Sequence, residues 1–253
     1  MEQQSLDFLR GLIEHISPSG YEQEAAAFWR QRTAAFAPEV TADVHGNSIA
    51  RLNFERQPRV MLAGHIDEIG YMVRYIDKEG FLYFGTVGGI DLHLVPGQRV
   101  WIKTRKGKIL GVVGKKPIHL MEPEELKKVV TIDQVWIDIG ATSEQQAREM
   151  VEIGDVAVPA QGFELLTEDR VVGRGFDDRA GAFVVSEVLR LLRGENFSAA
   201  VFGVATVQEE IGLRGAQTSA YGISPDIGIA VDVSFATDFP SIDKKKTGEI
   251  SLG

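Results

Sequence analysis

The sequence predicts an α/β fold in which a layered domain of strands and helices is interrupted by a small β-barrel. Residues 199–207 form a near-continuous apolar run, which is typical of a strand buried on both faces of a sheet. Residues 180–192 carry apolar side chains at helical spacing. Between residues 70 and 161, short β-type runs alternate with turns rich in Gly, Pro and Lys, a pattern that favours a small barrel.

The first part of the α/β domain is expected in residues 1–69. Residues 6–16 have helical spacing, and a Ser-Pro-Ser-Gly sequence stops that helix. Ser19 and Glu22 then have the spacing of a capping box for a second helix, which ends near Pro38. A hairpin and a buried strand are expected next, at residues 41–52 and 60–63.

Residues 70–161 are expected to form the inserted β domain, and residues 162–253 are expected to continue the α/β domain without its C-terminal part. The strands expected in the insert include residues 80–84, 99–102 and 109–113, with short helices at 122–130 and 143–151. After the insert, the helix at 180–192 and two strands, at 199–207 and 227–233, restore the α/β order, and both strands are expected to be buried on both faces.

Composition and charge exclude several classes of binding partner and of chemistry. The formal net charge of -9 argues against nucleic acid or an anionic membrane, because both would be repelled. The chain has no cysteine, so thiolate chemistry and disulfides are excluded. The N-terminus lacks the features of a secretory signal, and no apolar stretch reaches membrane-spanning length. We therefore expect a soluble, cytoplasmic protein.

His65 and Asp67 follow the predicted strand at 60–63 and form the first candidate site. A lone histidine is usually a core residue with a backbone partner. Asp67 changes that expectation, because residues i and i+2 of an extended segment point to the same side. A carboxylate there can orient the imidazole toward a metal ion. We therefore interpret His65 as a metal ligand and Asp67 as its orienting partner.

Acidic residues lie at three further places where strands end or a helix begins. The first place is Asp177-Asp178-Arg179, where the aspartates could simply cap a helix and pair with the arginine. One aspartate can cap the helix while the other bridges two metal ions. The adjacent carboxylates of Glu209 and Glu210 would repel each other without a cation, which favours metal binding. The alternative is that both carboxylates are solvated at the end of a strand. Asp232, flanked by apolar residues, would be a buried charge unless a metal or an arginine lies near.

Four segments, GHIDEIG, GRGFDDRAGA, VQEEIGLRGA and AVDVSFATD, resemble in this order and spacing the tetrahedral aminopeptidase family of cytosolic dinuclear metallo-aminopeptidases. The family includes glutamyl, leucyl and lysyl aminopeptidases, and some relatives are labelled endoglucanase or cellulase M. The resemblance extends through essentially the whole chain. It implies a zinc-peptidase-like α/β/α sandwich with an inserted β-barrel, short peptides as substrates, and dimers formed through the insert that assemble into a dodecamer.

The resemblance also implies the roles of the site residues. His65, Asp177 and Asp232 would hold one divalent ion, and Asp177 and Glu210 would hold the other. The ions would be zinc or cobalt, with manganese as a further choice. Glu209 would be the general base for a metal-activated water, and Asp67 would orient His65. The peptide bond between Asp177 and Asp178 is expected to be cis.

Two alternatives remain open. Relatives supply a last metal-binding histidine from beyond the position of Gly253, and the other histidines here match no such motif. The chain would then be a fragment, fill its second metal site differently, or act without catalysis as an assembly or peptide-binding subunit. A glycoside hydrolase is the other alternative; it needs two carboxyl groups flanking a sugar and no metal.

Overall fold

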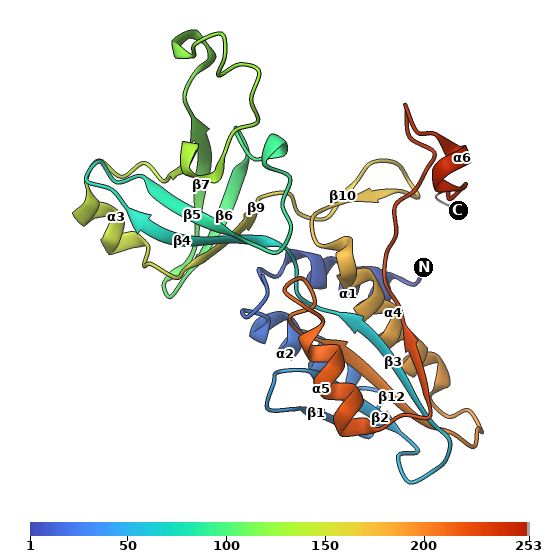
Figure 1. Cartoon of the computed structure of the whole chain (residues 1–253). Coiled ribbons are helices and arrows are strands. Elements are labelled where there is room, and N and C mark those ends of the chain that lie inside the picture. The colour runs from blue at the N-terminus through green and yellow to red at the C-terminus, as the bar shows by residue number, and fades with distance from the viewer. Residues whose placement is uncertain (252–253) are drawn as a thin grey trace.

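The computed structural model describes residues 1–251, which form a sheet-and-helix body and a separate barrel (Figure 1). The body contains a five-stranded sheet of order β1-β2-β12-β3-β13. β1 and β2 form the predicted antiparallel hairpin, and β3 runs parallel to both β12 and β13. The strands of this sheet are β1 (Glu39–Ala42), β2 (Ser48–Leu52), β3 (Arg59–His65), β12 (Ala200–Thr206) and β13 (Ile227–Ala230).

Helices cover both faces of this sheet, so the predicted α/β/α sandwich is confirmed. β12 is buried along its whole length, and its side chains alternate between two cores. Val201 packs in the core formed with three helices, whereas Phe202 packs on the opposite face with Ile223 of the fourth helix. The first three helices are α1 (Gln3–Glu14), α2 (Gln23–Thr33) and α4 (Phe176–Leu192), and the fourth is α5 (Arg214–Ile223).

Six strands close into the predicted small barrel, in the order β4-β5-β8-β7-β6-β9. The barrel has its own apolar core, which includes Leu82, Val100, Ile102 and Ile137. Its strands are β4 (Gly70–Ile76), β5 (Leu82–Val87), β6 (Arg99–Thr104), β7 (Gly107–Lys115), β8 (Val135–Asp138) and β9 (Val156–Pro159). All six lie within the segment that the sequence predicts to be an insert.

One of the two helices expected in the insert is present. α3 (Glu144–Met150) starts at Ser143, whose hydroxyl accepts a hydrogen bond from the backbone N–H of Gln146. The helix expected at residues 122–130 is wrong, because that segment forms only turns. Its apolar side chains Leu126 and Val129 are about half exposed, so no packing supports a helix there.

Short elements complete the described chain. They are the 3-10 helices η1 (Leu92–Leu94), η2 (Ile118–Leu120) and η3 (Ile132–Gln134), the strands β10 (Glu164–Leu165) and β11 (Val171–Val172), and the helix α6 (Lys244–Thr247). α5 and these pieces were not expected from the sequence, since they carry few apolar residues at regular spacing. Within residues 1–251, no helix has both the length and the apolar character needed to cross a membrane.

The strand expected at residues 227–233 needs a correction. β13 ends at Ala230, and its four residues are all exposed, because it is an edge strand whose one neighbour among the strands of residues 1–251 is β3. Asp232 follows the strand in an irregular segment and is also exposed. The expectation of a buried charge at Asp232 is therefore wrong.

The strand ends explain where a site can form. β3, β12 and β13 are parallel, so their carboxyl ends meet at one edge of the sheet, where crevices form in open α/β sheets. The chain leaves β3 at His65 and enters the barrel at Gly70, which brings the barrel beside this edge (Figure 1). The Lys103 ammonium group lies 3.1 Å from the Glu24 carboxylate, and this contact joins the barrel to α2.

Candidate metal centre

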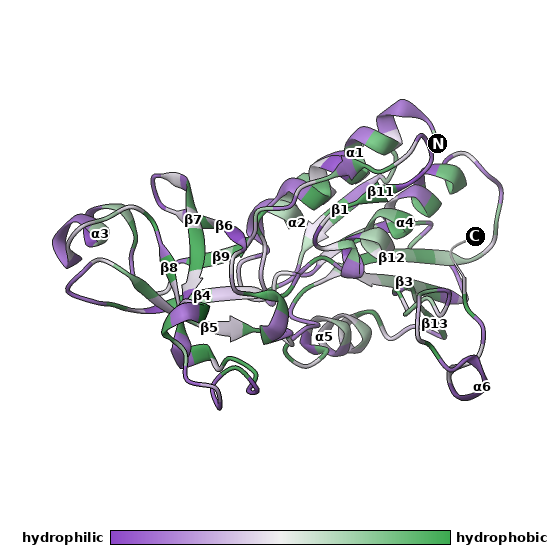
Figure 2. Cartoon of the chain, turned by 90° about the horizontal axis from the view of Figure 1, so that it is seen from above, coloured by the Kyte–Doolittle hydropathy of each residue, from purple (hydrophilic) through white to green (hydrophobic). Residues whose placement is uncertain are grey.

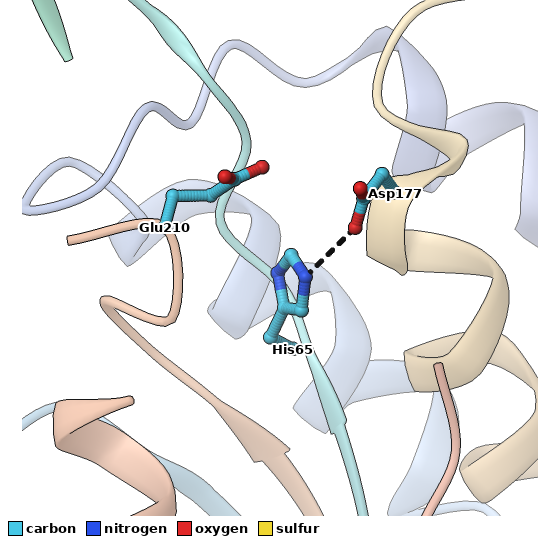
Figure 3. A group of neighbouring side chains, drawn as sticks. All are labelled: His65, Asp177 and Glu210. Atoms are coloured by element: carbon cyan, nitrogen blue, oxygen red, sulfur yellow. Dashed lines mark hydrogen bonds and ion pairs between the residues drawn. The ribbon is translucent and has the colours of Figure 1, made fainter. Parts of the chain in front are cut away.

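Three segments far apart in the sequence bring an imidazole and carboxylates together. His65 is the last residue of β3, Asp177 lies in the first turn of α4, and Glu210 lies in the loop after β12. Figure 3 shows the three side chains around one space, with His65 Nε2 3.0 Å from Asp177 Oδ1. One potential ligand atom from each of the three residues lies within 4.8 Å of the others.

Asp67 is fully buried and lies behind the imidazole. His65 Nδ1 is 3.4 Å from Asp67 Oδ1 and 3.2 Å from the Asp67 carbonyl oxygen. These acceptors hold the proton on Nδ1, so Nε2 is the nitrogen directed toward Asp177. This arrangement is the one expected for residues i and i+2 after an extended segment.

The same carboxylate fixes the backbone of the glutamate loop. The N–H groups of Glu209 and Glu210 donate to Asp67 Oδ1 and Oδ2 at 3.0 and 3.1 Å. Ser19 Oγ donates to Asp67 at 2.5 Å. The carboxylate of Glu22 accepts from the N–H of Gln208 at 3.2 Å.

The predicted capping box is therefore wrong, because Ser19 and Glu22 bind the site segments and leave α2 without a side-chain cap.

The two aspartates at the start of α4 have different surroundings. Asp178 is fully buried, and its oxygens accept from the N–H of Gly181 at 2.9 Å and the N–H of His65 at 3.1 Å. The Asp177 side chain is 62% exposed. One aspartate therefore caps the helix while the other remains open.

The Asp177-Asp178 peptide bond is cis, as the resemblance implies. Pairing of the aspartates with Arg179 is not observed, because Arg179 contacts Glu68 instead.

A second group of potential ligands shares His65. It consists of His65, Asp178 and Asp232, with one atom from each again within 4.8 Å of the others. The resemblance implies Asp177, and not Asp178, beside His65 and Asp232. Glu209 Oε2 lies 3.7 Å from His65 Nε2. The five other residues that the sequence predicts for the site thus lie around the imidazole of His65.

Two glycines allow β3 and α4 to approach each other at the site. A Cβ atom on Gly64 would lie 2.4 Å from the backbone carbon of Gly181, a contact that no side-chain rotation can relieve. A Cβ atom on Gly181 would lie 2.3 Å from an Asp178 oxygen and 2.5 Å from the Val231 carbonyl oxygen. The absence of both side chains sets the distance between His65 and the aspartates.

Residues 46–253 match the M42 glutamyl aminopeptidase family. The chain belongs to this family. The lysyl aminopeptidase of Pyrococcus furiosus is 41% identical over 250 residues, which cover 98% of this chain and 71% of that protein. The TET aminopeptidase of the marine sediment archaeon Thaumarchaeota archaeon SCGC AB-539-E09 superposes with a TM-score of 0.92 at 40% identity, covering 95% of this chain and 69% of that one. The Pyrococcus horikoshii TET1 peptidase, which can assemble into a tetrahedron or a large octahedral shell, gives 0.87 at 36% identity over 98% of this chain and 73% of that one.

Metal dependence of M42 peptidases agrees with the electrostatics of this site. Burial raises the pKa of Glu210 to about 7, and the nearby charge of Asp177 contributes. Burial likewise raises the pKa of Asp178 to about 7, with Asp232 contributing. Burial opposes the charged form of His65, but the Asp67 carboxylate outweighs it and raises the His65 pKa to about 9. Crowded carboxylates with raised pKa values are groups that a bound cation would stabilise.

Other residues around this M42 site were not singled out from the sequence. Glu68, Arg174 and Arg179 form a buried charged cluster beside the site, and Ser19 and Glu22 hold the loops. Glu68 and Arg179 fall inside the quoted motifs, but a single sequence does not reveal that they meet. Ser19 and Glu22 did give a signal, although it was interpreted as a helix cap.

We expect Gly64→Ala to weaken metal binding strongly and to lower the free energy of unfolding by about 1–3 kcal/mol, because the new methyl group would push α4 away from β3. Gly222→Ala is the matched control: it lies in α5 with nothing within 4 Å of the added Cβ. The control should be neutral or slightly stabilising. Calorimetric zinc titration and urea unfolding measure both effects. Unchanged zinc affinity in Gly64→Ala would contradict this account of the strand–helix approach.

We expect the apparent affinity for a divalent ion to rise between pH 6 and pH 8.5, since metal binding must displace protons from Glu210 and His65. The Glu210 pKa of about 7 and the His65 pKa of about 9 mean that both groups hold protons at the acidic end of this range. Zinc titrations in two buffers with different ionisation enthalpies count the protons released. Affinity independent of pH, with no proton release, would rule out these two residues as ligands.

Proposed function

We propose that this member of the M42 family is a metal-dependent aminopeptidase that releases N-terminal residues from short peptides at the site around His65. The observation that carries the proposal is the convergence of one imidazole with the carboxylates of three separate segments. Imidazole nitrogen and carboxylate oxygens suit zinc, cobalt or manganese. A site that held no cation would leave the crowded carboxylates of Asp177 and Glu210 to repel each other.

The proposed ligands are His65, Asp177, Glu210 and Asp232, which would hold two divalent ions. We assign Asp177 to bridge the two ions, because its carboxylate is exposed and does not cap the helix. Asp178 lies within ligand distance of His65, but each of its oxygens already accepts a backbone hydrogen bond. When bound, the two ions would lower the pKa of the attacking water and polarise the scissile carbonyl group.

Glu209 is the proposed general base. Its side chain is 28% exposed, so it can reach both the site and a substrate. Burial raises its pKa, and the surrounding carboxylates add to this effect. A raised pKa suits a group that accepts a proton from water and then donates it to the leaving amine. Asp67 would hold His65 and the backbone of Glu209 still during this transfer.

Assembly is a further part of the proposal. We propose homo-oligomers, built from dimers through the barrel, with a dodecamer as the final state. The support is that residues 116–134 extend away from the barrel (Figure 1) and expose large apolar side chains. Those side chains are Ile118, Leu120, Leu126 and Val129. In the hydropathy colouring of Figure 2, the ribbon around the barrel carries green, apolar stretches next to purple, hydrophilic ones. We place the protein in the cytoplasm and expect no nucleic-acid or membrane partner.

The two other functions are less well supported by this geometry. A glycosidase needs two carboxyl groups on opposite sides of a sugar, whereas here the carboxylates crowd around one imidazole. If the protein were a glycosidase, metal chelators would leave its cleavage of glycans unaffected. A subunit that only binds peptides or assembles would show no hydrolysis of any aminoacyl chromogenic substrate after loading with cobalt or zinc.

We expect Glu209→Gln to lower kcat on aminoacyl substrates by about a hundred- to ten-thousandfold, because glutamine keeps the shape but cannot accept the proton. Metal content should stay close to that of the unchanged protein. Glu164→Gln, at an exposed position in β10, is the control and should retain activity. Full activity in Glu209→Gln would remove Glu209 from the base role. No hydrolysis by the unchanged, metal-loaded protein would overturn the proposed function.

A further inference from the structure

Three charged side chains that the proposed mechanism does not use form a buried cluster beside the metal centre. Glu68 and Arg174 are 2% and 8% exposed, and Arg179 is fully buried. Arg179 Nη2 lies 2.6 Å from Glu68 Oε1, and Arg174 Nη1 lies 3.1 Å from Glu68 Oε2. One carboxylate thus binds two guanidinium groups in the interior of the body.

The cluster also binds the segment that follows α1. Arg179 donates to Ser17 Oγ at 2.5 Å and to the Ile13 carbonyl oxygen at 3.0 Å. The N–H of Ser17 donates to Glu68 Oε1 at 3.1 Å. Arg174 donates to the carbonyl oxygens at the end of α1, including that of Glu14 at 3.2 Å. These carbonyls lack partners within the helix, and a cation at this end of a helix is favourable.

The positions of these residues in the sequence connect the cluster to the site. Glu68 directly follows Asp67, and Arg179 comes two residues after Asp177. The Glu68–Arg179 contact therefore joins the segment that carries His65 to the turn that carries the open aspartate. Gly175 leaves room for this contact, because a Cβ atom there would lie 3.0 Å from both Arg179 Nη1 and Glu68 Oε2.

Stability alone is a weak reason for such a cluster. Removing charged groups from water is costly, and a buried ion pair often contributes no more stability than well-packed apolar residues. A directional contact between two charged groups can instead specify one arrangement of the segments that carry them. Here the segments specified are the ones that carry the proposed ligands.

We propose that Glu68 and Arg179 are positioning residues that set the separation between His65 and Asp177, and so the geometry of the metal centre. They touch neither the ions nor the substrate and act through the backbone segments they join. The inference rests on the proposed function for its effect on turnover. Its effect on metal geometry can be measured without turnover.

The test uses Glu68→Gln and Arg179→Lys, which keep much of the side-chain volume but weaken the contact. Each variant is loaded with cobalt, and its visible absorption spectrum is compared with that of the unchanged protein. We expect a changed spectrum in both variants. We also expect kcat to fall by about ten- to a hundredfold, the effect of a small misplacement of reacting groups, while KM changes much less.

Thr33→Val is the matched control for loss of a buried hydrogen bond. Thr33 is fully buried in α2, and its hydroxyl donates to the Trp29 carbonyl oxygen at 2.8 Å and contacts Ser186. We expect it to lower stability while leaving the cobalt spectrum and kcat unchanged. The same spectral change in Thr33→Val would overturn the proposal, because general loosening would then explain the effect.

Unchanged cobalt spectra in folded Glu68→Gln and Arg179→Lys would also overturn it. If neither variant folds, Ser17→Ala removes only the hydroxyl that contacts Arg179 and Ile66, and an unchanged spectrum in that variant overturns the proposal too. If the unchanged protein shows no hydrolysis, the proposed function fails, but the cobalt spectra still decide whether Glu68 and Arg179 set the metal geometry.

Discussion

The site depends on the hydrogen bonds made by one buried carboxylate. Asp67 accepts from the backbone N–H groups of Glu209 and Glu210 and from Ser19, and it faces Nδ1 of His65. These contacts outweigh the effect of burial and keep the Asp67 pKa below its usual range. A charged Asp67 is therefore available at neutral pH to hold the imidazole and the glutamate loop in one arrangement.

Packing of the backbone supplies the second part of the arrangement. Gly64 and Gly181 let α4 approach β3, which brings Asp177 to within 3.0 Å of His65 Nε2. The site is consequently built at the ends of β3 and α4, with the glutamate loop after β12 held by Asp67. Such a framework can hold ligands without the reorganisation that a mobile loop would require, which is how preorganised sites keep their geometry.

Much of the fold could be predicted because it depends on local patterns. The run at residues 199–207 and the spacing at 180–192 specify buried elements on their own. The exposure of β13 could not be predicted, since an apolar edge strand has the same sequence pattern as a central one. The roles of Ser19 and Glu22 could not be predicted either, because a capping box has the same spacing as this long-range donor and acceptor. The contact of Glu68 with Arg179 is set only by tertiary structure.

Anomalous diffraction from crystals of the zinc- or cobalt-loaded protein tests the central claim most directly. We expect two anomalous peaks about 3.5–4 Å apart, one of them bound by His65 Nε2, with the Asp67 carboxylate on the opposite side of the imidazole and bound to neither ion. Metal bound through His65 Nδ1 or by the Asp67 carboxylate, or peaks located away from His65 and Asp177, would contradict the account.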